Sequence, residues 1–165
     1  TNVPEAIQYG AHRVKILNVE ALLKRLHEEG IYVIARITVF QDPVLAAARP
    51  DLAVQSLAQK GLWADYKGLG WVDPASQDVW NYTVAIARDA ADRGFDEINF
   101  DYVRFPSDGD LKDMVFPVWD REGGRRQTMQ DFFSYLRDAS ELRSEVRSQR
   151  TYSVVEPFSS PQFFL

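Results

Sequence analysis

The chain has 165 residues, a formal net charge of −5 and 45% hydrophobic residues, which fits one soluble domain with a core. The acidic balance argues against a nucleic-acid surface, because no block of Lys and Arg recurs beyond 121–126. No apolar run is long enough to span a membrane, and a chain without cysteine has neither disulfides nor thiolate metal sites.

The first part of the chain predicts a helix, a strand and a short helix, in that order. Asn18 is the predicted N-cap of an amphipathic helix that stops at Gly30. Residues 31–40 are rich in β-branched and aromatic side chains and predict a strand. Residues 44–49 predict one helical turn, and this order fits a right-handed βαβ connection.

The rest of the chain continues the alternation of loops, helices and strands. In order, the predicted segments are a loop-rich connection at 50–75, a helix at 76–93 capped by Ser76, the central strand at 95–104, a long uncovered loop at 105–127, a helix capped by Thr128 and a third strand at 151–155. A loop as long as 105–127 is more often functional than idle in a compact domain. Residues 150–165 form a tail of uncertain placement.

The predicted central strand carries polar residues on one of its two faces. Alternation puts Glu97, Asn99 and Asp101 on one face and Ile98 and Phe100 on the other. A buried parallel strand normally reads as an apolar run, and a carboxylate without partners is costly to bury. The polar row therefore indicates a solvated functional cavity, at the strand end where parallel α/β proteins keep their active sites.

A second polar row is predicted on the strand at 31–40. Arg36 and Thr38 share a face with Phe40 there and interrupt an apolar run. Because Arg36 faces the same cavity as Asp101, it can hold that carboxylate ionised or bind a substrate. The alternative is structural, a buried pair in which Asp101 only braces Arg36.

Four separate blocks of the sequence resemble one known family. They are GIYVIARITVFQDP at 30–43, ARPDLA at 48–53, WVDP at 71–74 and GFDEINFDYVRFP at 94–106. In this order the blocks are similar to a bacterial and archaeal family of glycoside hydrolases, a domain of unknown function within the glycosidase clan. The resemblance covers residues 18–140 and implies an α/β fold of the (β/α)₈ TIM-barrel type, a carbohydrate substrate and an extracellular or cell-envelope location.

A whole barrel of this type takes about 250 residues, so residues 1–165 are expected to form a single, partial barrel domain. The chain is a fragment, lacks segments, or uses a partial barrel, and the sequence leaves these three readings open. A half barrel leaves strand edges unpaired, so another chain or a missing segment is expected to pair with them.

The resemblance directs attention to carboxylates, because glycosidases use two of them to flank the scissile bond. Asp101 is the first candidate, as nucleophile or as charge stabiliser. The second is open among Asp42, Glu97, Asp108 and Glu156, and Asp42 is favoured because it stands just past the carboxyl end of a strand.

Candidate substrate contacts come from the polar faces and from aromatic side chains. Arg36 and Asn99 face the predicted cavity, whereas Arg104 points the other way by alternation unless the strand bends at its end. Flat aromatic rings suit the apolar faces of pyranoses, although each ring alone is more often loop packing. The candidate platforms are Trp63, Tyr66, Trp71 and Trp119. No cluster of His and carboxylates is present, so no metal or other cofactor is expected.

Two classes of function follow from this pattern. The first is a retaining or inverting glycosidase that acts on a polysaccharide or oligosaccharide. The alternative is a non-catalytic carbohydrate-binding or assembly module derived from a glycosidase barrel. The number of carboxylates in the cavity discriminates between them, because two at glycosidase spacing favour the enzyme and one alone favours the binding module.

Overall fold

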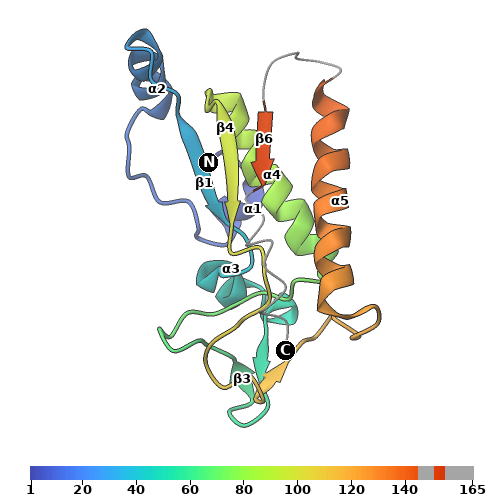
Figure 1. Cartoon of the computed structure of the whole chain (residues 1–165). Helices are drawn as coiled ribbons and strands as arrows, with labels where there is room; N and C mark the ends of the chain where they lie inside the picture. The colour runs from blue at the N-terminus through green and yellow to red at the C-terminus, as the bar shows by residue number, and fades with distance from the viewer. Residues whose placement is uncertain (145–150, 155–165) are drawn as a thin grey trace.

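The computed structural model describes residues 1–144 and 151–154, and its centre is a three-stranded parallel sheet (Figure 1). The strands, in spatial order, are β1 at Ile34–Thr38, β4 at Glu97–Asp101 and β6 at Thr151–Val154. Both pairings with β4 are parallel, as predicted for the two polar strands. The predicted third strand is confirmed by β6, whereas the rest of the tail, 155–165, lies outside the described residues.

Helices pack against one face of this sheet, and a second small sheet lies beyond the carboxyl ends of its strands (Figure 1). The helices are α1 at Pro4–Gln8, α2 at Val19–Glu28, α3 at Pro43–Ala48, the 3₁₀ turn η1 at Pro50–Leu52, α4 at Gln77–Arg93 and α5 at Gly124–Ser144. The small antiparallel sheet has the order β3-β2-β5, with β2 at Gln55–Ser56, β3 at Gly61–Leu62 and β5 at Met114–Val115. It joins the two long connections at 50–75 and 105–127, so the second of these is not the uncovered loop that was expected.

Local side chains set several of the helix ends. Asn18 Oδ1 accepts a hydrogen bond from Ala21 N at 2.9 Å and caps α2, and Ser76 caps α4. Gly94 ends α4 with a φ of +112°, a left-handed conformation that glycine adopts at little cost. These ends agree with the prediction from sequence.

The predicted cap at Thr128 is wrong. The helix α5 already begins at Gly124, so Thr128 lies inside its early turns. There its Oγ1 donates to the Gly124 carbonyl at 3.3 Å, a bond within the helix rather than a cap. The sequence signal was a weak one, since a hydroxyl residue followed by an acidic residue also occurs within helices.

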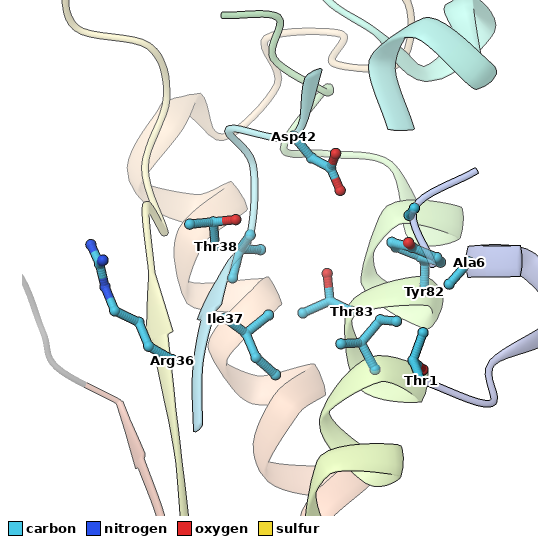
Figure 2. A pocket seen from close by; sticks show the side chains of 11 residues that line it. Thr1, Ala6, Arg36, Ile37, Thr38, Asp42, Tyr82 and Thr83 are labelled. Atoms are coloured by element: carbon cyan, nitrogen blue, oxygen red, sulfur yellow. The ribbon is translucent and has the colours of Figure 1, made fainter. Parts of the chain in front are cut away.

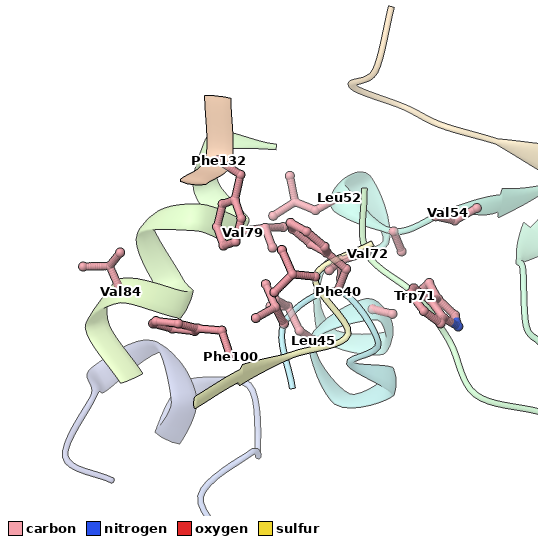
Figure 3. Close-up of a cluster of buried hydrophobic side chains, with 14 of the residues drawn as sticks. Phe40, Leu45, Leu52, Val54, Trp71, Val72, Val79, Val84, Phe100 and Phe132 are labelled. Carbon is pink, nitrogen blue, oxygen red and sulfur yellow. The ribbon is translucent and has the colours of Figure 1, made fainter. Parts of the chain in front are cut away.

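The hydrophobic core lies between the sheet, α4 and α5 and continues through α3 and η1 into the connection at 50–75 (Figure 3). Ile98 and Phe100 of β4 are 2% and 4% exposed, which confirms the predicted apolar face of that strand. Phe132 of α5 is fully buried, and its ring centroid lies 5.0 Å from that of Phe40 and 5.6 Å from that of Trp80. Helices from two parts of the chain are thereby fixed to the same side of the sheet.

Phe40 corrects the predicted strand face. Simple alternation put it beside Arg36 and Thr38, but it is 0% exposed and belongs to the core. The strand β1 ends at Thr38, so the period of two no longer applies to the residues that follow it. The polar face of β1 is therefore shorter than the sequence suggested.

We predict that Phe132→Ala lowers the free energy of unfolding by about 3–5 kcal/mol, because it removes a buried ring and leaves a cavity. The matched control is Leu17→Ala, since Leu17 is 97% exposed, and this change is expected to stay within about 0.5 kcal/mol. Chemical denaturation of both variants measures the difference. Equal stability of the two variants would contradict the packing of α5 on this core.

Candidate functional site

The carboxyl ends of β1 and β4 carry an ion pair on the face of the sheet turned away from the core. Arg36 Nε donates to Asp101 Oδ2 at 2.7 Å, and Arg36 Nη2 donates to the same oxygen. The two side chains are 65% and 36% exposed, so the pair is open to solvent. The alternative prediction of a buried structural pair is therefore wrong. An ion pair this exposed contributes at most about 1 kcal/mol to the free energy of unfolding.

The backbone turns sharply directly after Asp101. Tyr102 has a φ of +55°, in the left-handed region that residues other than glycine rarely adopt. Asp101 Oδ1 accepts a hydrogen bond from Tyr102 N at 2.7 Å and stabilises this turn. Strain of this kind is concentrated at functional sites, and here it ends the strand beside the exposed carboxylate.

The turn also redirects Arg104, whose position alternation could not predict. The Arg104 guanidinium lies 4.9 Å from the centroid of the Trp71 ring and 5.5 Å from that of Tyr102. Its Nη1 donates to Ser107 Oγ at 2.6 Å. The strand does bend at its end, and the charge of Arg104 acts on Asp101.

The surroundings of Asp101 favour its ionised form. Desolvation by itself would raise the pKa of this carboxyl. The hydrogen bonds from Arg36 and Tyr102 N, together with the positive charges of Arg36 and Arg104, outweigh desolvation and lower the pKa below its ordinary value. Asp101 is therefore an anion that is paired with Arg36, is subject to the positive charge of Arg104 and is partly open to solvent.

Asn99 lies on the same face of β4, opposite Arg36 in the sheet register, and is half-buried. Thr38 is the register partner of Asp101 and is exposed. Together with the ion pair, these side chains form a polar surface whose composition agrees with the alternation read from sequence. We call Arg36, Thr38, Asn99, Asp101 and Arg104 the polar face.

Asp42 occupies a different environment. It is the N-cap of α3, where its Oδ1 accepts from Val44 N at 3.0 Å and from Leu45 N at 2.9 Å. Desolvation raises the pKa of Asp42 above its ordinary value, although the two backbone hydrogen bonds oppose this shift. A carboxyl group with a raised pKa is suited to donating a proton.

A cavity of about 290 Å³ lies beside Asp42, lined also by Thr38, Tyr82 and Thr83 (Figure 2). Figure 2 shows the Asp42 carboxylate directed toward this cavity and the Arg36 guanidinium directed away from it. Arg36 and Thr38 of the polar face are also among the residues that line this cavity, whereas Asp101 is not among the described residues that line it. The structure thus places Asp42 and Asp101 in different surroundings. Sequence could not show this difference, because there one residue simply follows a strand and the other ends one.

The other candidates for a second carboxylate are placed as follows. Glu97 is at the amino end of β4, where it accepts a hydrogen bond from the Tyr32 hydroxyl at 3.2 Å. Asp108 lies in the loop after β4, and its Oδ1 accepts from Tyr66 N at 3.4 Å. Glu156 lies outside the described residues. Of Glu97 and Asp108, it is Asp108 that follows the carboxyl end of β4.

Two of the predicted tryptophan platforms are buried. Trp63 and Trp71 are 2% and 1% exposed, and their indole N–H groups donate to Asp110 O and to Asp65 Oδ2. Neither ring presents a free face to a sugar, so the predicted platform role is wrong for both. Their burial depends on partners that are brought close only by the fold.

Trp119 is half-buried rather than open. Its ring packs against Phe105, with centroids 4.7 Å apart, and against Phe116, with centroids 5.2 Å apart. The Arg125 guanidinium lies 5.8 Å from its ring centroid. These neighbours identify Trp119 mainly as packing of the 105–127 loop.

Sequence reasoning missed a fully buried carboxylate that holds this loop. Asp73 is 0% exposed, and its Oδ2 accepts from Val118 N at 2.8 Å and from Trp119 N at 2.9 Å. Its Oδ1 accepts from Ala75 N at 2.9 Å. The bonds to residues 118 and 119 join segments 45 and 46 residues apart, so no local pattern could have indicated them.

A second buried carboxylate fixes the turn at 65–69. Asp65 is 6% exposed, and its Oδ1 accepts from Lys67 N and Leu69 N, while its Oδ2 accepts from the side chains of Gln41 and Trp71. Desolvation favours a higher pKa of Asp65, but these hydrogen bonds outweigh it and lower the pKa. The Asp-x-x-Gly spacing at 65–68 is a turn signal that could have identified part of this arrangement.

Within residues 1–144 and 151–154, no group of three or more His, Cys, Asp or Glu side chains could hold a metal ion. The same part of the chain contains no helix that is both long and apolar enough to cross a membrane.

Comparison with known proteins gives one family match. The profile of a family described as "Putative glycosyl hydrolase domain" matches residues 1–157. A search of curated protein sequences found no match. The family match covers more of the chain than the resemblance at 18–140, because it begins at residue 1 and also includes β6.

Several solved structures are similar to this chain. A hypothetical protein from Ruminiclostridium thermocellum ATCC 27405 aligns with 36% identity and a TM-score of 0.77, over 93% of this chain and 73% of that chain. A GH31 α-xylosidase from a soil metagenome aligns with 12% identity and a TM-score of 0.57, over 81% of this chain. An α-galactosidase from Thermus thermophilus aligns with 15% identity and a TM-score of 0.53, over 82% of this chain. The chain spans only 20% and 26% of these two enzymes, and at such identities the likeness shows the fold alone.

We predict that the same substitution destabilises the protein much more at Asp73 than at Asp101. Asp73→Ala is expected to lower the free energy of unfolding by about 2 kcal/mol or more, because it leaves buried backbone N–H groups without an acceptor. Asp101→Ala is expected to cost less than about 1 kcal/mol, because its pair with Arg36 is exposed. Thermal or urea unfolding of the two variants makes the comparison, and a larger loss for Asp101→Ala would contradict the assignment.

Proposed function

Because the chain belongs to this family of glycosyl hydrolase domains, we propose that it acts on a polysaccharide or oligosaccharide and that Asp101 is its catalytic nucleophile or charge stabiliser. The single observation that carries the proposal is the exposed, ionised Asp101 that pairs with Arg36 at the carboxyl end of β4. Parallel α/β barrel enzymes keep their catalytic groups at this end of the sheet.

We further propose that the parallel sheet and its helices are part of a (β/α) barrel of TIM type. The fold similarity to the α-xylosidase and the α-galactosidase supports this, with TM-scores of 0.57 and 0.53. Among the described strands, β1 pairs only with β4, so its other edge presents unpaired backbone groups. We infer that a further strand, from elsewhere in the same protein or from another chain, pairs with this edge and completes more of the barrel.

The proposed chemistry uses Asp101 as an anion. In the nucleophile role, an Asp101 oxygen forms a bond to the anomeric carbon while the glycosidic oxygen leaves with a proton from an acid. Water then hydrolyses the ester and restores the carboxylate. In the stabiliser role, Asp101 forms no bond and its charge stabilises the oxocarbenium-like transition state. Arg36 and Arg104 keep the carboxylate ionised, and with Asn99 they supply hydrogen-bond donors for sugar hydroxyls.

The proton donor is the second part of the proposal. The raised pKa of Asp42 and its place on the cavity support it as the acid, whereas its two N-cap hydrogen bonds support a structural role. Asp108 is the alternative, since it lies in the loop that follows β4. The single variants Asp42→Asn and Asp108→Asn separate these roles. In the variant that lacks the proton donor, the fall of activity at high pH, which reports deprotonation of that acid, should disappear.

A non-catalytic carbohydrate-binding or assembly module is the second candidate function. One specific observation favours it: among the side chains of the polar face, Asp101 is the one carboxylate. One carboxylate suits binding, whereas glycosidic cleavage uses two. In either case the substrate class leads us to propose an extracellular or cell-envelope location.

Asp101→Asn tests the catalytic role. We expect hydrolysis to fall by about a hundredfold or more, because the variant loses the charge that stabilises the transition state. The melting temperature should stay near that of the unmodified protein, since the pair is exposed. The assay is run on a panel of polysaccharides, with Asp131→Asn on the exposed surface of α5 as the matched control. Retained activity per folded molecule would refute the proposal, and glycan binding without hydrolysis in the unmodified protein would favour the binding module.

Arg36→Gln tests the electrostatic part of the account. Activity requires ionised Asp101, so it is lost as pH falls through the lowered pKa of that group. Removing Arg36 removes a hydrogen bond and a charge that lower this pKa, which should rise toward the ordinary value of about 3.9. We therefore expect the acidic limb of the pH–activity profile to move to higher pH. Arg126→Gln, on the exposed surface of α5, should leave the limb in place; an unmoved limb in Arg36→Gln would contradict the proposed coupling.

A further inference from the structure

A chain of side-chain contacts links Asp101 to the turn at 65–69. Tyr102 follows Asp101 directly, the Arg104 guanidinium lies over the Tyr102 and Trp71 rings, and Trp71 Nε1 donates to Asp65 Oδ2 at 3.1 Å. Trp71 and Asp65 are buried, whereas Tyr66, the next residue along the chain, is 83% exposed. The buried contacts therefore fix the position of an exposed aromatic side chain relative to the polar face.

The backbone that carries Tyr66 is firmly held. Asp65 N donates to the Leu69 carbonyl at 3.1 Å, and Gly68 N donates to the Asp65 carbonyl at 2.9 Å. Tyr66 N itself donates to Asp108 Oδ1 at 3.4 Å, which ties the turn to the loop after β4. The two segments lie side by side beyond the carboxyl ends of the strands (Figure 1).

Close packing also fixes these two segments to each other. A side chain at Gly109 would meet the Trp63 ring at 2.7 Å and the Asp65 Cα at 3.2 Å, so only glycine allows this approach. The Tyr66 ring, in contrast, makes no ring contact or cation–π contact among the described residues. A rigid backbone that holds an uncovered aromatic ring is a preorganised binding surface.

We propose that Tyr66 is the stacking platform of an outer sugar subsite, which binds a pyranose ring of a chain whose reactive bond lies at Asp101. This inference rests on the proposed function of the polar face. The C–H face of a pyranose packs on a flat ring, while Asp108, whose Oδ1 already accepts from Tyr66 N, is placed to accept from the sugar's hydroxyls. It also assigns the platform role to the one predicted aromatic residue that the fold leaves open.

The structure provides a matched control for ordinary surface exposure. Tyr32 is 58% exposed, but its hydroxyl donates to Glu97 at the amino end of β4. It therefore resembles Tyr66 in type and exposure and lies at the opposite end of the same strand. A tyrosine that is merely on the surface should behave alike at both positions.

Calorimetric binding of oligosaccharides of increasing length tests the inference, with every variant made in the Asp101→Asn background to prevent hydrolysis. We expect Tyr66→Ala to weaken binding of the longer oligosaccharides by about fivefold to tenfold, on the scale of one aromatic contact. The shortest ligand should bind unchanged, because it does not reach an outer subsite. Tyr66→Phe should restore the lost affinity, and Tyr32→Ala should have no effect.

Each result supports or overturns the inference. Equal affinities of Tyr66→Ala and Tyr32→Ala for the longest ligand overturn it, and so does an equal loss at every length, which would signify a structural role. Failure of the proposed function looks different: length-dependent binding through Tyr66, with no hydrolysis by the unmodified protein, keeps the subsite and removes the enzyme. If no oligosaccharide binds, both proposals fall.

Discussion

Asp101 uses its two carboxylate oxygens for two different tasks, and the arrangement of the polar face depends on this division. Oδ1 accepts from Tyr102 N and stabilises the left-handed turn that ends β4, whereas Oδ2 accepts from Arg36 on the neighbouring strand. After the turn, the Arg104 guanidinium lies over the Trp71 and Tyr102 rings, and its charge helps to lower the pKa of Asp101. A side chain of another length or charge at this position could not supply both bonds.

Two buried carboxylates stabilise the loops by accepting hydrogen bonds from backbone N–H groups. Burying an anion is costly unless hydrogen bonds satisfy it, and Asp65 and Asp73 are almost fully enclosed by such donors. They hold the 65–69 turn and the 105–127 loop against the carboxyl side of the sheet. The same residue type is thus closed and structural at two positions, and open and partly solvated at Asp101.

The sequence predicted those features that depend on residues close together along the chain, and it missed those that depend on residues far apart. Alternation along 97–101 correctly assigned the polar and apolar faces, and the caps at Asn18 and Ser76 were found because a cap depends on residues three positions apart. The turn at Tyr102 carries no glycine to mark it. The burial of Trp71 depends in part on contacts with Tyr102 and Arg104, about 30 residues further along the chain, so a reading of the chain alone treated that ring as open.

The most direct test of the central claim is a crystal structure of the Asp101→Asn variant with a bound oligosaccharide. The account predicts that the sugar lies on the polar face, with its anomeric carbon about 3–3.5 Å from the side chain at position 101, the distance of a reactive contact. A sugar bound in the cavity beside Asp42, or elsewhere away from Arg36 and Arg104, would contradict it.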